Sequence, residues 1–124
     1  MNVVDSSGWL EYAAGGPGAD AFAPAVEDVA RLIVPSLCVY EVYRRMRPQR
    51  GDPAAFELIA AMMEGRIVEL DASLALMAAR TGLELGLPLA DSVIYTTARV
   101  HDATLWTQDA DFEGLEDARL VPKR

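Results

Sequence analysis

Acidic residues stand at the ends of two short apolar segments in this sequence. Asp5 ends the run NVVD (2–5), and Asp109 follows TLWT (104–107) within the stretch LWTQDADF (105–112). Both segments are rich in β-branched or aromatic residues, which predicts strands. In an open α/β sheet, ligands bind beyond the carboxyl ends of the strands. We therefore expect Asp5 and Asp109 to lie at one edge of a sheet.

Glu41 is a third candidate, because it is the only charged residue in the run LCVYEVY (37–43). This run is apolar on every side, so we expect its helix to be buried nearly all round. A lone buried carboxylate is costly unless it is paired or binds a metal. This cost favours a site role for Glu41, and an ion pair with Arg45, four residues along the helix, is the structural alternative.

Two further aspartates need to be separated from ordinary helix caps. Asp91 opens the predicted helix ADSVIYTTARVH (90–101), where an aspartate alone is best interpreted as a cap. Beside three other acids at one sheet edge, a site role becomes the better interpretation. Asp111 lies farther from its strand than Asp109, so we interpret Asp111 as a cap or turn residue that positions Phe112.

Carboxylates that converge in one cleft repel each other, and a divalent cation offsets that repulsion. Oxygen ligands favour Mg²⁺ or Mn²⁺ over Zn²⁺. With one cysteine and one histidine in the chain, a structural zinc site is disfavoured. A cation held by acids polarises a phosphoryl oxygen and activates water for attack, so hydrolysis of a phosphodiester suits such a cleft.

Composition indicates one globular domain over residues 1–124. Hydrophobic residues make up 52% of the chain, which is enough for a core, and the single Cys38 cannot form an internal disulfide. The start of the chain does not predict a signal peptide, and no apolar run predicts a membrane span, so we expect a cytoplasmic protein. The net charge of −8 argues against a generally basic nucleic-acid-binding surface.

Strands and helices are predicted to alternate along the whole chain. Helices are expected between the strands, with a loop at RPQRG (47–51) and Ser6 or Ser7 capping the first helix. The order predicts an α/β fold with a parallel sheet and right-handed crossovers. The predicted strands are 2–5, 31–35, 66–70, 104–107 and 119–122.

Four segments together resemble the PIN-domain family, and in particular the VapC-type toxins of toxin–antitoxin pairs. The segments are VVDSSGWLEY (3–12), VPSLCVYEVYRR (34–45), GLPLADSVIYTTAR (86–99) and TLWTQDADF (104–112). The resemblance implies a PIN-like three-layer α/β domain, with helices around a mostly parallel sheet of four to five strands. It also implies a Mg²⁺- or Mn²⁺-dependent endoribonuclease that hydrolyses RNA with metal-activated water. The family's acidic quartet corresponds to Asp5, Glu41, Asp91 and Asp109.

The resemblance also suggests finer roles and partners. Asp5 and Asp91 would carry most of the metal binding, with Glu41 and Asp109 in support. Two alcohols, Ser7 and Thr107, correspond to family positions that orient carboxylates or water. The implied partners are transfer or ribosomal RNA, a VapB-type antitoxin and a second copy of the chain. A PIN-like binding domain with little hydrolysis, and a structure-specific DNA nuclease, are the alternatives.

A cluster of arginines lies on and after the Glu41 helix, and two interpretations of it remain open. The side chains could contact RNA phosphates beside the cleft. They could equally be solvated cations at a helix carboxyl terminus, where positive charge suits the helix dipole. The cluster comprises Arg44, Arg45, Arg47 and Arg50.

Overall fold

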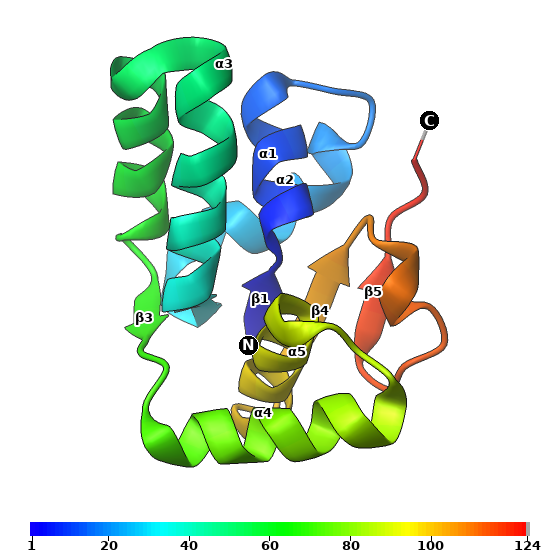
Figure 1. The fold of residues 1–124 in the computed structure, drawn as a ribbon. Helices are drawn as coiled ribbons and strands as arrows, with labels where there is room; N and C mark the ends of the chain where they lie inside the picture. Colours follow the sequence, from blue (N-terminus) through cyan, green and yellow to red (C-terminus); the bar gives the residue numbers. More distant parts are fainter. Residues whose placement is uncertain (124) are drawn as a thin grey trace.

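Strands and helices alternate along the chain in the computed structural model, which describes residues 1–123 (Figure 1). Arg124, the last residue of the predicted domain, lies outside the described residues. The strands are β1 (Asn2–Val4), β2 (Leu32–Pro35), β3 (Arg66–Val68), β4 (Thr104–Thr107) and β5 (Ala118–Leu120). The helices are α1 (Ser6–Ala14), α2 (Ala19–Glu27), α3 (Ser36–Met62), α4 (Ala72–Leu85) and α5 (Leu89–Val100), with short 3-10 helices η1 (Val29–Arg31) and η2 (Ala110–Phe112).

The five strands form one parallel sheet in the order β3-β2-β1-β4-β5. The central strand β1 pairs with β2 and β4, so Val3 lies between Ile33 and Leu105. Because all the strands run in one direction, their carboxyl ends meet at one edge. The predicted α/β fold with a parallel sheet is confirmed.

Both faces of the sheet are covered by helices, as a parallel sheet requires. Val3 and Val4 point to opposite faces of β1, and neither side chain is exposed to solvent. In Figure 1, α5 lies in front of the sheet and begins beside the carboxyl ends of β1 and β4. The core between these layers is apolar, and its largest fully buried side chains include Trp9, Phe22, Leu32, Ile33, Ile94, Leu105 and Phe112.

Helix α3 differs from the prediction in two ways. The predicted loop at 47–51 is wrong, because the helix continues to Arg50 and the chain reverses only at Gly51. Gly51 has a φ of 81° and a ψ of 173°, a conformation that is essentially restricted to glycine. The two halves of α3 therefore form a hairpin and lie side by side (Figure 1).

The same helix is also less buried than predicted. Its inward face carries Cys38, Val42 and Met46, which are four residues apart and buried. Tyr40 is 56% exposed, and Glu41 is half-buried. The expectation of a helix buried nearly all round is therefore wrong, because only one stripe of α3 faces the core.

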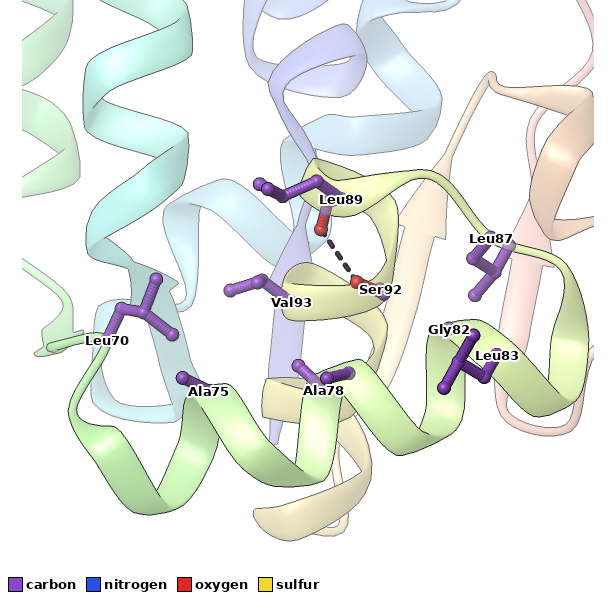
Figure 2. Close-up of a pocket in the computed structure, with 10 residues that line it drawn as sticks. Leu70, Ala75, Ala78, Gly82, Leu83, Leu87, Leu89, Ser92 and Val93 are labelled. Atoms are coloured by element: carbon purple, nitrogen blue, oxygen red, sulfur yellow. Dashed lines mark hydrogen bonds between the residues drawn. The ribbon is translucent and has the colours of Figure 1, made fainter.

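Helix α4 lies at the opposite end of the molecule from α1 and packs on α5 (Figure 1). Only Leu74 and Ala78 of this helix are buried, whereas Leu76 and Leu83 are 74% and 88% exposed. An apolar groove of about 490 Å³ lies between the two helices (Figure 2). Among residues 1–123, no helix combines the length and apolar character that crossing a bilayer requires.

Candidate functional site

Asp5 follows the central strand and begins helix α1. Its Oδ1 accepts hydrogen bonds from Ser7 Oγ at 2.7 Å and from the Gly8 backbone N–H at 3.0 Å. Its Oδ2 accepts a hydrogen bond from Thr107 Oγ1 at 2.6 Å. Asp5 is therefore the α1 cap, in place of the predicted Ser6 or Ser7. Both carboxylate oxygens are held in one orientation.

Three other aspartates form a tight group beside Asp5. Carboxylate oxygens of Asp91, Asp109 and Asp111 all lie within 4.8 Å of one another. Asp91 is the third residue of α5, and Asp109 lies two residues beyond β4. The Asp109 N–H donates to Thr107 Oγ1 at 2.9 Å, and Asp109 Oδ1 accepts from the Asp111 N–H at 2.9 Å.

Asp111 corrects one interpretation made from the sequence. The residue that caps the short helix η2 is Asp109, and Asp111 brings its carboxylate to the group instead. The signal for this was present in the Asp-x-Asp spacing of LWTQDADF. The interpretation of Asp111 as a cap is wrong, whereas its interpretation as a turn residue agrees with its place within η2. The distance from the strand end does not indicate which way η2 turns.

The electrostatics of the acids reflect their convergence. The pKa of Asp91 is raised to about 7 by burial and by the negative charges of Asp109, Asp111 and Asp5. Burial also raises the pKa of Asp5, although hydrogen bonds from Thr107, Ser7 and Gly8 oppose this effect. Nearby negative charges therefore make ionisation of the Asp91 and Asp5 carboxyl groups less favourable.

Glu41 approaches Asp5 from helix α3. Ser6 Oγ donates a hydrogen bond to Glu41 Oε1 at 3.1 Å, which joins Glu41 to the residue beside Asp5. Among the described residues, Glu41 makes no ion pair with Arg45, so the structural alternative is wrong. Cys38 is fully buried on the same helix, where burial and the charges of Asp5 and Glu41 raise the pKa of its thiol well above the usual value.

Glu11 and Gln108 also lie beside the acids, and the sequence patterns do not predict this. Glu11 Oε2 accepts hydrogen bonds from the Gly18 N–H at 2.9 Å and from Gln108 Nε2 at 3.1 Å. The Gln108 N–H donates to Ser7 Oγ at 3.2 Å. These contacts tie α1 to the segment between Thr107 and Asp109. The only indication of these contacts in the sequence is that Gln108 is a polar residue between Thr107 and Asp109.

The donor set of Asp91, Asp109 and Asp111 fits a divalent cation. All three residues offer carboxylate oxygens, which are the ligands that Mg²⁺ and Mn²⁺ prefer. Opposite ligands of Mg²⁺ stand roughly 4.2 Å apart, twice its ~2.1 Å bond length, which is close to the observed spread. A cation would also neutralise the charges that raise the pKa of Asp91.

Arginines of the predicted cluster lie on the exposed side of the α3 hairpin. Arg44 Nη1 donates to the hydroxyl of Tyr40 at 2.7 Å, and Arg47 Nε lies 3.3 Å from Asp52 Oδ1. Arg45 is exposed and lines a hollow that also contains Glu41. The cluster therefore adjoins the acids on the side of Glu41.

Comparison with known proteins decides the family. The PIN domain matches residues 3–117, which is nearly the whole chain. The chain belongs to the PIN-domain family. No curated protein sequence matches this PIN domain significantly.

Solved structures share the fold of this PIN domain. A toxin–antitoxin complex from Klebsiella pneumoniae contains a chain with a TM-score of 0.81 and 18% identity, and 96% of each chain is covered. VapC20 from Mycobacterium tuberculosis, described as a toxin that cleaves the sarcin–ricin loop, has a TM-score of 0.75 at 18% identity, with 96% of this chain and 99% of that chain covered. VapBC2 from Rickettsia felis, bound to a DNA fragment from its promoter, has a TM-score of 0.72 at 12% identity, with 98% and 97% covered.

Proposed function

We propose that this PIN domain is a divalent-metal-dependent endoribonuclease and the toxin of a toxin–antitoxin pair. The observation that carries the proposal is the group of Asp91, Asp109 and Asp111 next to Asp5 at the carboxyl edge of the sheet. The shared fold with VapC20, which is described as cleaving an RNA loop, supports RNA as the substrate.

The residues of the chain would divide the work between holding a cation and orienting the carboxylates. Asp91, Asp109 and Asp111 would hold the ion, and Asp5 would complete its shell from the position fixed by Ser7 and Thr107. When bound, Mg²⁺ or Mn²⁺ would polarise the scissile phosphate and lower the pKa of a water molecule. Glu41, held by Ser6, is the carboxylate available to position that water.

The proposed partners follow from the structural neighbours. The Klebsiella and Rickettsia proteins were solved as toxin–antitoxin complexes, so we infer a VapB-type antitoxin as the inhibitor of this chain. A second copy of the chain is the proposed occupant of the apolar surface between α4 and the start of α5, where Leu83 of α4 and Leu89 of α5 are 88% and 74% exposed. The groove there contains no titratable side chain and offers no means of catalysis (Figure 2).

Cleavage of matched RNA and DNA oligonucleotides tests the proposed activity. The parent protein should cleave the RNA with Mg²⁺ or Mn²⁺ and should leave the DNA intact. Cleavage should stop when EDTA is added. Asp91→Asn should lose at least ~10²-fold in rate, because a ligand of the ion has been neutralised. Asp20→Asn, an exposed acid on α2, is the matched control and should cleave like the parent.

Three results of this experiment would contradict the proposal. Cleavage that persists in EDTA would exclude the metal mechanism. Cleavage of DNA in preference to RNA would favour the alternative nuclease. A parent protein that binds metal but cleaves neither oligonucleotide would favour the alternative binding domain.

A further inference from the structure

An exposed groove of about 640 Å³ runs along the α3 hairpin, away from the α4 surface. Its wall combines rings and guanidinium groups: Tyr40, Tyr43 and Phe56 with Arg44 and Arg47. Tyr40 and Phe56 are each 56% exposed, which is unusual for two large aromatic side chains that share one groove. The volume lies within the range of about 300–1,000 Å³ typical of sites for small ligands.

The aromatic rings are held in place before any ligand binds. Arg44 Nη1 donates to the Tyr40 hydroxyl at 2.7 Å, and its guanidinium carbon lies 5.9 Å from the Tyr40 ring centroid. The rings of Tyr43 and Phe56 lie 5.6 Å apart, and the Tyr43 hydroxyl donates to Asp52 at 2.8 Å. A ligand that stacks on these rings would therefore lose little side-chain entropy on binding.

The segment 44–50, which supplies Arg44 and Arg47 to the groove, is the most basic part of an acidic chain. Four of the 11 lysines and arginines fall between Arg44 and Arg50, whereas the net charge is −8. Arg47 is paired with Asp52 at 3.3 Å. Over residues 1–123, neither Arg44 nor Arg45 makes an ion pair, so both charges are available to an anion.

A second hollow joins the groove to the candidate active site. It measures about 350 Å³ and is lined by Tyr40, Glu41, Arg44 and Arg45. Tyr40 and Arg44 line both depressions, so the surface continues from the aromatic rings to Glu41. Glu41 in turn accepts the hydrogen bond from Ser6, the neighbour of Asp5.

We propose that this groove binds unpaired bases of the RNA next to the cleavage site. The bases would stack on Tyr40 and Phe56, and Arg44 and Arg45 would contact the phosphates that lead to Glu41. Stacking on aromatic rings beside cations that follow the backbone is how proteins hold single strands. This inference rests on the proposed ribonuclease function and adds that the substrate is single-stranded on the Glu41 side.

Charge and shape favour RNA over the other candidate occupants. A paired helix buries its base faces, so a duplex could use the arginines but not the rings. An acidic peptide would also suit the arginines, but it offers no flat surfaces to stack on exposed aromatic faces. The combination of rings and unpaired guanidinium groups is matched best by a single strand.

Fluorescence anisotropy with a short labelled oligoribonucleotide tests the inference, with EDTA present to prevent cleavage. The parent should bind the single strand more tightly than a duplex of the same sequence. Tyr40→Leu and Phe56→Leu should each weaken single-strand binding by about tenfold, because a stacking surface is lost. Tyr40→Phe keeps the ring and loses only the hydroxyl contact with Arg44, so it should weaken binding much less than Tyr40→Leu does.

The arginines make a separate prediction about salt. Arg44→Ala combined with Arg45→Ala should flatten the dependence of log K on log salt by about 1.4, or roughly 0.7 per lost phosphate contact. Arg31→Ala removes an exposed charge outside the groove and is the matched control. Melting curves of all variants should overlay, because the substituted side chains are exposed.

Failure of this inference can be told apart from failure of the proposed function. If the parent cleaves RNA but Tyr40→Leu and Phe56→Leu bind the single strand as tightly as the parent, only the groove assignment is wrong. Equal affinity of the parent for single strand and duplex would overturn it as well. The inference would also be overturned if Tyr40→Leu and Phe56→Leu bound RNA normally but were no longer inhibited by the antitoxin, because the groove would then bind a protein. If the parent cleaves no RNA with Mn²⁺, the proposed function itself fails.

Discussion

At the scale of single residues, the acids differ in what their oxygens already bind. Asp5 has both oxygens occupied by hydrogen bonds from Ser7, Gly8 and Thr107. Asp91 and Asp111 instead lie among other carboxylates, and burial and like charge raise the pKa of Asp91 to about 7. Hydrogen bonds thus fix the Asp5 carboxylate, whereas the carboxylates around Asp91 repel one another, and a bound cation would reduce that repulsion.

Asp111 provides the first test at this scale. Asp111→Asn should raise the concentration of Mn²⁺ needed for half-maximal cleavage by about tenfold or more, because the group loses one negative ligand. The rate at saturating Mn²⁺ should change less, since Asp91 and Asp109 remain. Glu113→Gln, an exposed acid two residues away, serves as the control. An unchanged metal requirement in Asp111→Asn would show that this carboxylate is not a ligand.

Asp91 predicts how metal-dependent stability changes with pH. Because its folded-state pKa is about 7 and its unfolded value is near ~3.9, its contribution to stability is fully present below ~3.9 and is lost as the pH rises through about 7. The melting temperature of the metal-free parent should therefore fall between about pH 4 and pH 7, relative to that of Asp91→Asn.

The stabilisation by Mn²⁺ should change in the opposite direction. A cation binds the ionised carboxylate, so the rise in melting temperature on adding Mn²⁺ should grow as the pH passes through about 7. Differential scanning fluorimetry at a series of pH values measures both trends. A Mn²⁺ effect that is independent of pH in the parent would contradict the assignment of Asp91.

At the scale of elements, the sheet explains why the site forms and the α3 hairpin explains its flank. The ends of β1 and β4 bring Asp5 and Asp109 to one edge, and α5 adds Asp91 at its first turn. The reversal at Gly51 folds the second half of α3 back on the first, which places Phe56 beside Tyr43. The turn at Gly51 therefore determines the shape of the groove along the α3 hairpin.

Gly51→Ala should destabilise the protein by about 1–3 kcal/mol, because a Cβ is strained at a φ of 81° and a ψ of 173°. Urea denaturation measures the change. Gln49→Ala, an exposed substitution in the preceding helical turn, should alter the free energy of unfolding by no more than about 0.5 kcal/mol. Equal stability of the parent and Gly51→Ala would show that the turn relaxes without strain.

Elements were more predictable from the sequence than their exact ends and faces. The strands could be predicted because short β-branched runs alternate with helical segments, and Asp5 followed from the end of such a run. The loop at 47–51 was wrong, because Pro48 is tolerated within the helix and only Gly51 breaks it. Tyr40 could not be placed, since an apolar run does not reveal which stripe faces the core.

The site was predicted in part for a similar reason. The positions of Asp109 and Asp91 could be predicted from strand and helix boundaries, which local patterns reveal, but the site role of Asp91 followed only from its expected convergence with the other acids. The position of Asp111 depends on η2, whose turn is fixed by the packing of Phe112 at 1% exposure and 6.4 Å from the Tyr95 ring. Such packing is a tertiary effect that local spacing does not encode.

At the scale of the whole molecule, charge and apolar surface are separated. The acids meet at the carboxyl edge, the arginines lie along α3, and exposed leucines lie along α4.

The exposed leucines lead to a prediction about the proposed homodimer. Leu83→Glu should shift the protein from dimer to monomer in sedimentation equilibrium, because a charge enters the proposed apolar contact between the two copies. Ser73→Glu places a charge at an exposed position of the same helix and should leave the dimer intact. A parent that sediments as a monomer would contradict the proposed homodimer.

Direct binding of Mn²⁺ is the measurement that tests the central claim most closely. Electron paramagnetic resonance reports the free ion, so a titration gives its affinity without substrate or cleavage. The account predicts that the parent and Asp20→Asn bind Mn²⁺ equally, and that Asp91→Asn and Asp109→Asn bind it at least about tenfold more weakly. Equal affinity in all four proteins, or no binding by the parent, would contradict a metal centre at the carboxyl edge of the sheet.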